Sequence, residues 1–111
     1  METNWKILNL KREVDNGLVI EVTYVMNFKL QGESDRKIGV IKLEGDENDP
    51  NFIAFEELTE EIVLDWVKSE LGQEEIDNIK TQHQTRLEER IYKKLNPEYL
   101  QGLPWGENKL T

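Results

Sequence analysis

The single histidine is the first candidate for chemistry in this chain. His83 is the only histidine among the 111 residues. An imidazole acts as a general base or a metal ligand only when suitable partners lie within reach. On a helix, its neighbours are three or four residues away, and there the sequence offers Arg86 and no carboxylate. We therefore interpret His83 as a residue on the surface or on the apolar stripe of a helix.

The carboxylates form an acidic loop and several adjacent pairs. Residues 46–49 (DEND) offer oxygens to a cation but lack the alternating spacing and the distal glutamate of an EF-hand, so we expect a turn. Acid–base catalysis needs carboxylates whose pKa values are pushed apart, and sequence neighbours on a solvated surface do not meet that need. The pairs are Glu56-Glu57, Glu60-Glu61 and Glu74-Glu75. We expect no catalytic residue, no metal site, no cofactor and no enzymatic activity.

Negative charge is concentrated in one segment. Residues 46–75 carry eleven acidic side chains and one basic one, whereas residues 1–45 are neutral and residues 76–111 have a net charge of +1. Such a surface repels phosphates, so we expect no binding to nucleic acid. It is either a solvated surface or a docking surface for a basic partner. For docking, the candidate side chains are Glu56, Glu57, Glu60 and Glu61.

Large apolar side chains are also gathered in the C-terminal segment, residues 96–111 (NPEYLQGLPWGENKLT). Gly102 and Pro104 disfavour regular structure there. Either this tail folds back and fills a gap in its own domain, or it is a docking peptide anchored by Trp105, since tryptophan is enriched at binding hot spots. We expect the tail to return to or near the domain. The candidate partner-binding residues are Tyr99, Leu100, Leu103, Pro104 and Trp105.

Elements that would position these residues follow from hydrophobic periodicity. Residues 4–14 alternate loosely, residues 18–30 place apolar side chains on one face at period two, and residues 36–44 form a third apolar stretch. Asp15-Asn16-Gly17 is a tight-turn signal. The pattern predicts a three-stranded antiparallel meander over residues 1–45, with one face that needs a cover.

Two helices are predicted after the acidic loop (46–58). Thr59 is suited to cap a helix that runs to about Leu71 and covers the sheet, and Gly72 ends it. A second helix, about residues 73–95, has a thin apolar stripe that includes His83. This helix either lies along the domain edge or pairs with a second chain, which would make a homo-oligomer. We expect a single α+β domain over residues 1–111, with residues 59–95 as two helices and residues 96–111 as an irregular tail.

Composition limits the location of the protein. There is no cysteine, no apolar run long enough to span a membrane and no signal-peptide pattern at the N-terminus. We expect an intracellular protein without a membrane partner.

The order of these elements resembles a small uncharacterised family from tailed bacteriophages, including cyanophages. The resemblance covers nearly the whole chain: a tryptophan in the first strand (NWKILNLKR), the block F-x-x-L-T-E-E-x-V-x-x-W-V from Phe55 to Val67, and the Pro-Trp tail. The block is a capping and packing signature rather than a catalytic one. The resemblance implies a phage protein, in the virion or the host cytoplasm.

Two functions follow as expectations. The first is a non-enzymatic virion-associated or assembly accessory protein that contacts a phage structural protein through its tail. The second is an early effector that binds and inhibits a host protein through the acidic 46–75 surface.

Overall fold

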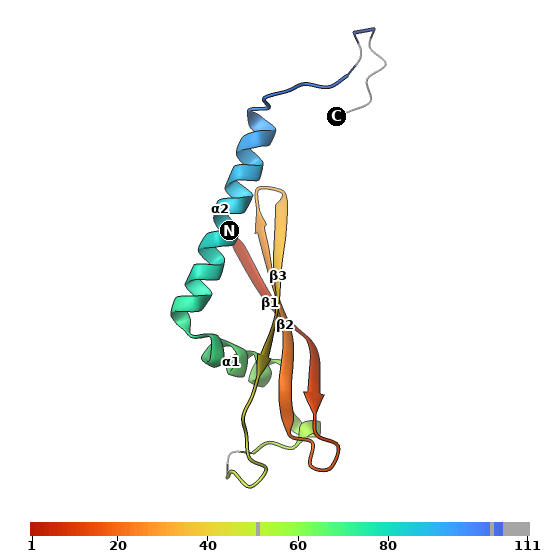
Figure 1. Cartoon of the computed structure of the whole chain (residues 1–111), viewed down its shortest axis with the longest axis vertical. Coiled ribbons are helices and arrows are strands. Elements are labelled where there is room, and N and C mark those ends of the chain that lie inside the picture. The colour runs from red at the N-terminus through yellow and green to blue at the C-terminus, as the bar shows by residue number, and fades with distance from the viewer. Residues whose placement is uncertain (51, 103, 106–111) are drawn as a thin grey trace.

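The computed structural model describes residues 1–50, 52–102 and 104–105. Within them the chain forms strands β1 (Glu2–Arg12), β2 (Val19–Leu30) and β3 (Glu33–Lys42), a 3₁₀ turn η1 (Phe55–Glu57), and helices α1 (Glu60–Leu71) and α2 (Gln73–Leu95). The strands make one antiparallel sheet in the order β1-β2-β3, and both helices follow it in sequence (Figure 1). The predicted α+β fold with a three-stranded meander is confirmed.

Residues with positive φ lie in both turns of the sheet. Gly17 has a φ of 72°, and the Asn16 side chain accepts a hydrogen bond of 2.9 Å from the backbone N–H of Leu18. Between β2 and β3, Gln31 and Gly32 both have positive φ (47° and 81°). Two such residues match the twist of a tight hairpin, so only two residues separate the end of β2 from the start of β3.

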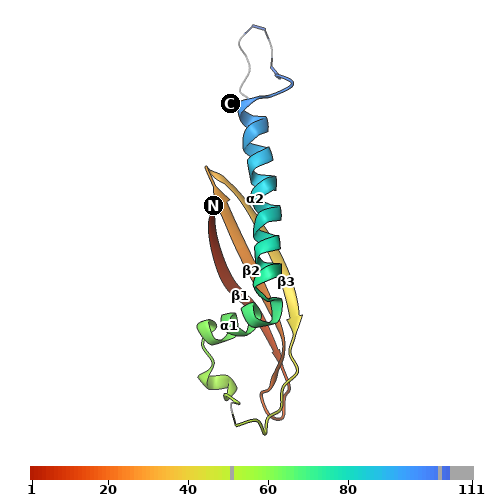
Figure 2. The same cartoon turned by 90° about the vertical axis from the view of Figure 1, so that its left-hand side faces the viewer.

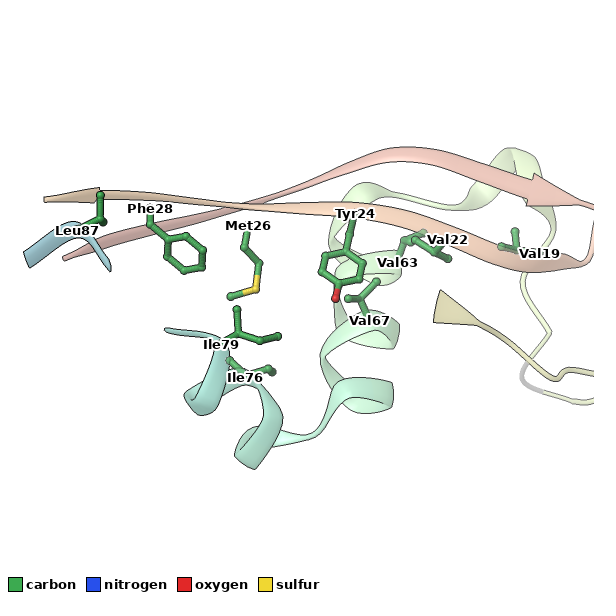
Figure 3. Packing of buried hydrophobic residues seen from close by; sticks show 10 residues of the cluster. All are labelled: Val19, Val22, Tyr24, Met26, Phe28, Val63, Val67, Ile76, Ile79 and Leu87. Atoms are coloured by element: carbon green, nitrogen blue, oxygen red, sulfur yellow. The ribbon is translucent and has the colours of Figure 1, made fainter. Parts of the chain in front are cut away.

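The core lies on one face of β2. Its side chains alternate between the two faces of the sheet, and those on one face point toward the helices (Figure 3). Each large apolar side chain that is fully buried stabilises the folded state by about 1.5–3 kcal/mol. The buried cluster contains Val19, Val22, Tyr24, Met26, Phe28, Val63, Val67, Ile76, Ile79 and Leu87.

An irregularity in β1 explains its loose alternation. Ile7 pairs with Tyr24 and Asn9 pairs with Thr23, so Leu8 is an extra residue. Such a bulge restores the inward direction three residues after Ile7 instead of two. Leu10 therefore packs against the core together with Ile7.

Both helices cover the same face of the sheet (Figures 1 and 2). The Thr59 hydroxyl accepts a hydrogen bond of 3.3 Å from the backbone N–H of Ile62, so the predicted cap is confirmed. Gly72, with a φ of 79°, ends α1 and lets α2 start one residue later. Helix α1 packs on β1 and β2, and α2 packs on β2 and β3. Both helices therefore cover the sheet, whereas the sequence predicts this role for the first helix alone.

Helix α2 is longer than the surface that it covers. Its last turns extend past the β2–β3 hairpin, and the tail continues from there (Figures 1 and 2). The radius of gyration is 20.7 Å, and the largest extent is 73 Å. A compact chain of this length has a radius of about 13 Å. The molecule is therefore elongated, and the tail starts away from the sheet.

Gly39 of β3 permits a close approach of the Tyr24 ring to the backbone of β3. Tyr24, opposite it in register, lies across its backbone, and a Cβ at position 39 would lie 2.5 Å from Cζ and 2.8 Å from Cε1 of Tyr24. We expect Gly39→Ala to lower the free energy of unfolding by about 1–3 kcal/mol, because the buried ring has to move. Urea unfolding measures this change, with the exposed neighbour substitution Val40→Ala as control.

A double-mutant cycle isolates the cause. If contact with the Tyr24 ring causes the destabilisation, Gly39→Ala lowers the free energy of unfolding much less in a Tyr24→Ala background than in the wild type. Equal costs in the two backgrounds would contradict this explanation.

Candidate functional site

His83 is buried between α2 and the sheet. Its Nδ1 lies 2.8 Å from Oδ2 of Asp35, and its ring stacks on Phe28 with a centroid separation of 4.7 Å and an angle of 13° between the planes. His83 is therefore a stripe residue, as one of the two interpretations held. Its partner Asp35 was missed, because it lies 48 residues away on β3.

Asp35 collects several positive groups from α2. Arg86 Nη1 lies 3.3 Å from Oδ2, and Arg90 Nη2 lies 4.0 Å from Oδ1. Burial acts to raise the pKa of Asp35. Hydrogen bonds from His83 and the backbone of Arg36, together with the charges of His83 and Arg86, outweigh burial and lower that pKa. The carboxylate is thus held ionised.

The same contacts continue along the helix. Arg90 Nη1 donates to the backbone carbonyl of Ser34 at 2.7 Å, and Lys94 Nζ lies 2.9 Å from Oε2 of Glu33. The basic side chains 83, 86, 90 and 94 recur at helical spacing and face the start of β3. Because the imidazole is stacked and its carboxylate partner is engaged, we interpret this Asp35 cluster as an anchor that sets the position of α2. A general base has instead to reach a substrate proton.

The acidic loop is organised by its own hydrogen bonds. Asp46 Oδ1 accepts from the backbone N–H of Asn48 at 2.9 Å and from its side-chain amide at 3.2 Å, as in an Asx turn. Among the described residues, no group of three or more His, Cys, Asp or Glu side chains could hold a metal ion.

The four glutamates of the predicted acidic surface are all exposed, but they are not equivalent. Glu56 and Glu57 lie on η1, while Glu60 and Glu61 open α1. Glu60 Oε2 accepts a hydrogen bond of 3.2 Å from the backbone N–H of Ile7, which ties α1 to the edge strand β1. Glu60 is therefore partly engaged within the domain.

An apolar pocket of about 250 Å³ opens beside this acidic surface. It lies between the end of the sheet, the loop after β3 and helix α1. Acidic side chains from the loop, Glu44, Asp46 and Asp49, contribute to its walls. Its apolar lining includes Leu18, Leu43, Phe52, Ile53, Leu58 and Trp66.

The described tail residues, 96–102 and 104–105, do not return to the domain, so for them that expectation was wrong. Tyr99, Leu100 and Trp105 are 79%, 88% and 68% exposed, and Pro104 is exposed as well. Leu103 lies outside the described residues. The reason is geometric: α2 carries the chain past the sheet before the tail begins, and the core is closed by the two helices without it.

Comparison with known proteins places this chain in a family. Residues 1–105 match the domain of unknown function DUF7936. The chain belongs to the DUF7936 family. No curated protein and no solved structure matches it. The DUF7936 match includes the tail as far as Trp105, so the sheet, both helices and that part of the tail all lie within it. No described helix of this DUF7936 chain is long and apolar enough to cross a membrane.

The Asp35 cluster predicts how the stability of this DUF7936 chain depends on pH. The folded-state pKa of Asp35 is lowered, so its contribution is fully present above the unfolded-state pKa of about 3.9 and is lost as pH falls through the folded-state value. Asp35→Asn should cost about 1–3 kcal/mol near neutral pH. The difference from the wild type should shrink below about pH 4. Urea unfolding across pH measures it.

The exposed aspartate Asp65 of α1 provides a control, since Asp65→Asn removes the same charge outside the cluster. Its effect should stay within about 0.5 kcal/mol. An Asp35→Asn penalty that stays constant down to about pH 3 would show that ionisation of Asp35 does not carry the contribution.

Proposed function

We propose that this protein is a non-enzymatic, virion-associated or assembly accessory protein of a tailed bacteriophage. It acts by binding a structural protein of the phage. The observation that carries the proposal is the exposed aromatic tail at the far end of α2. The sequence resemblance to phage proteins supports an origin in a phage, and the exposed tail supports action by binding another protein.

The tail has the chemistry of a binding anchor. Tyr99, Leu100 and Trp105 expose large apolar areas within seven residues. Burying each of them would contribute about 1.5–3 kcal/mol, and all three side chains are more than half exposed in the structure. Trp and Tyr bury much area at a small cost in conformational entropy, so they often dominate binding energy. The extension of α2 holds this anchor clear of the domain.

We predict that the tail determines binding to the particle. In pull-downs from phage-infected cells, the full chain should capture a capsid or tail protein. The double substitution Leu100→Ser/Trp105→Ala should reduce this capture at least ~10-fold, since hot-spot truncations cost about 2 kcal/mol or more. The protein should also be present in purified particles at stoichiometric copy number.

A matched control is available at the opposite end of the molecule. Val14, in the β1–β2 turn, is 97% exposed, and Val14→Ser removes apolar area without touching the tail. This variant should bind like the wild type. Absence of the protein from purified particles, or equal capture by the tail variant, would refute the proposal.

The alternative function is an early effector that binds a host protein through the acidic surface. The exposure of Glu56, Glu57 and Glu61, together with the net charge of −10 over residues 46–75, favours it. Opposite potentials speed association and make binding sensitive to salt. A partner recognised in this way would be basic.

The alternative predicts a charge-dependent interaction. Glu56→Gln/Glu57→Gln/Glu61→Gln should weaken binding to a host partner about 5- to 30-fold and flatten its salt dependence, as measured by calorimetry. Glu60 is left intact because it bonds to β1. Asp15→Asn/Glu89→Gln/Glu98→Gln makes the same change in net charge elsewhere and should have little effect. Equal losses in both triple variants would point to net charge rather than to this surface.

A further inference from the structure

The sheet has a second face that neither helix covers. Both helices lie on one side, so the opposite side, the open face, is formed by alternate residues of all three strands. At its centre Val25 of β2 pairs with Ile38 of β3, and Val40 follows two residues later on the same face. Ile38 and Val40 are 48% and 54% exposed. The open face therefore has an apolar centre.

Basic side chains surround this centre. Every residue of the three strands is described, and the register places five basic and two acidic side chains on the open face. Lys11 Nζ lies 3.9 Å from Oε2 of Glu21, so these two charges partly neutralise each other. Among the described residues, Lys6, Arg36 and Lys42 have no acidic partner within 4.0 Å. The open face is thus positive around an apolar patch.

The same chain carries the complement of this surface. The pocket of about 250 Å³ is apolar inside and has Glu44, Asp46 and Asp49 in its walls. Residues 46–75, which include most of its acidic surroundings, have a net charge of −10. An apolar site within negative charge and an apolar patch within positive charge attract each other, and burial of the apolar parts adds to the attraction.

Symmetry decides between two modes of self-association. Packing two open faces against each other, as in a two-fold dimer, would place like charges together. Packing the open face of one copy on the acidic pocket of another places opposite charges together. This second contact uses two different surfaces, so one bound copy still offers its pocket and the other still offers its open face.

We propose that the open face around Ile38 and Val40 is a docking surface for the acidic pocket of a second copy, which gives head-to-tail association. The contact uses neither the tail nor the apolar stripe of α2, which is already packed on its own sheet. It is therefore independent of the function proposed above.

Paired charge reversals test the proposal in the full chain. Arg36→Glu/Lys42→Glu makes the open face acidic, and Glu44→Lys/Glu57→Lys makes the pocket surroundings basic. Each variant alone then presents like charges on its two surfaces. In an equimolar mixture, the acidic open face of the first variant can dock on the basic pocket of the second, so opposite charges are again in contact. Sedimentation at low salt should show that the wild type and the mixture associate, whereas each variant alone is monomeric.

The size of the effect and the controls are set by the same physics. For the wild type, the dissociation constant should rise at least ~10-fold between about 0.05 M and 0.5 M salt, because exposed charges are screened. Lys37→Glu/Lys93→Glu reverses two charges off the open face, and Lys37 lies on β3 with its side chain on the helix side. This control should associate like the wild type. Ile38→Ser/Val40→Ser should weaken association without altering the charge.

Several outcomes would overturn the proposal. A wild type that stays monomeric at low salt excludes it, and so does self-association of either reversal variant at wild-type strength. A mixture that fails to associate, with both variants folded by circular dichroism, also excludes it. Loss of self-association in Leu100→Ser/Trp105→Ala would assign the contact to the tail. Loss of particle binding in that variant, with self-association intact, would leave both proposals standing.

Discussion

The apolar face of β2 has to be removed from water, and the rest of the structure follows from that requirement. Three strands bury little by themselves, so an isolated meander needs a cover on one face. Helix α1 covers the half toward β1, and α2 covers the half toward β3. The glycine between them, Gly72, lets a single connection serve both halves. The last residue of the buried core is Leu87 of α2, so the core is complete without the tail.

Apolar burial is not directional, and a second interaction sets the position of α2 on the sheet. Asp35 faces His83, Arg86 and Arg90 from one helix, while Phe28 stacks on the imidazole. An unpaired carboxylate at that place would be costly, so shifts of the helix along the sheet are disfavoured. The cluster thus holds α2 in the direction that carries the tail beyond the β2–β3 hairpin. The Asp35 cluster therefore determines where the tail begins relative to the sheet.

A cover on one side only leaves two unlike surfaces. The open face gathers basic side chains around Ile38 and Val40, while the acidic segment 46–75 contributes side chains to the walls of the apolar pocket beside Trp66. Antiparallel sheets commonly keep one solvated face, and most residues of this one are polar. The two exposed aliphatic side chains and the separated charges distinguish it from a plain solvated face. A chain with such surfaces is suited to contacts with other proteins, including its own copies.

Local signals determined the fold. Period two over residues 18–30, the Asn-Gly turn, the Thr59 cap and the Gly72 stop each depend on residues close together in sequence, and the structure contains the elements that they predict. Tertiary structure alone decided which partner His83 has, that Ile38 and Val40 lie on the open face, and that the described part of the tail stays clear of the domain. Asp35 and His83 are 48 residues apart, and no local pattern links them. The bulge at Leu8 likewise depends on pairing with β2. Such features are set by the docking of elements on a shared core, where geometry between distant segments, rather than the propensity of any one segment, sets the free energy.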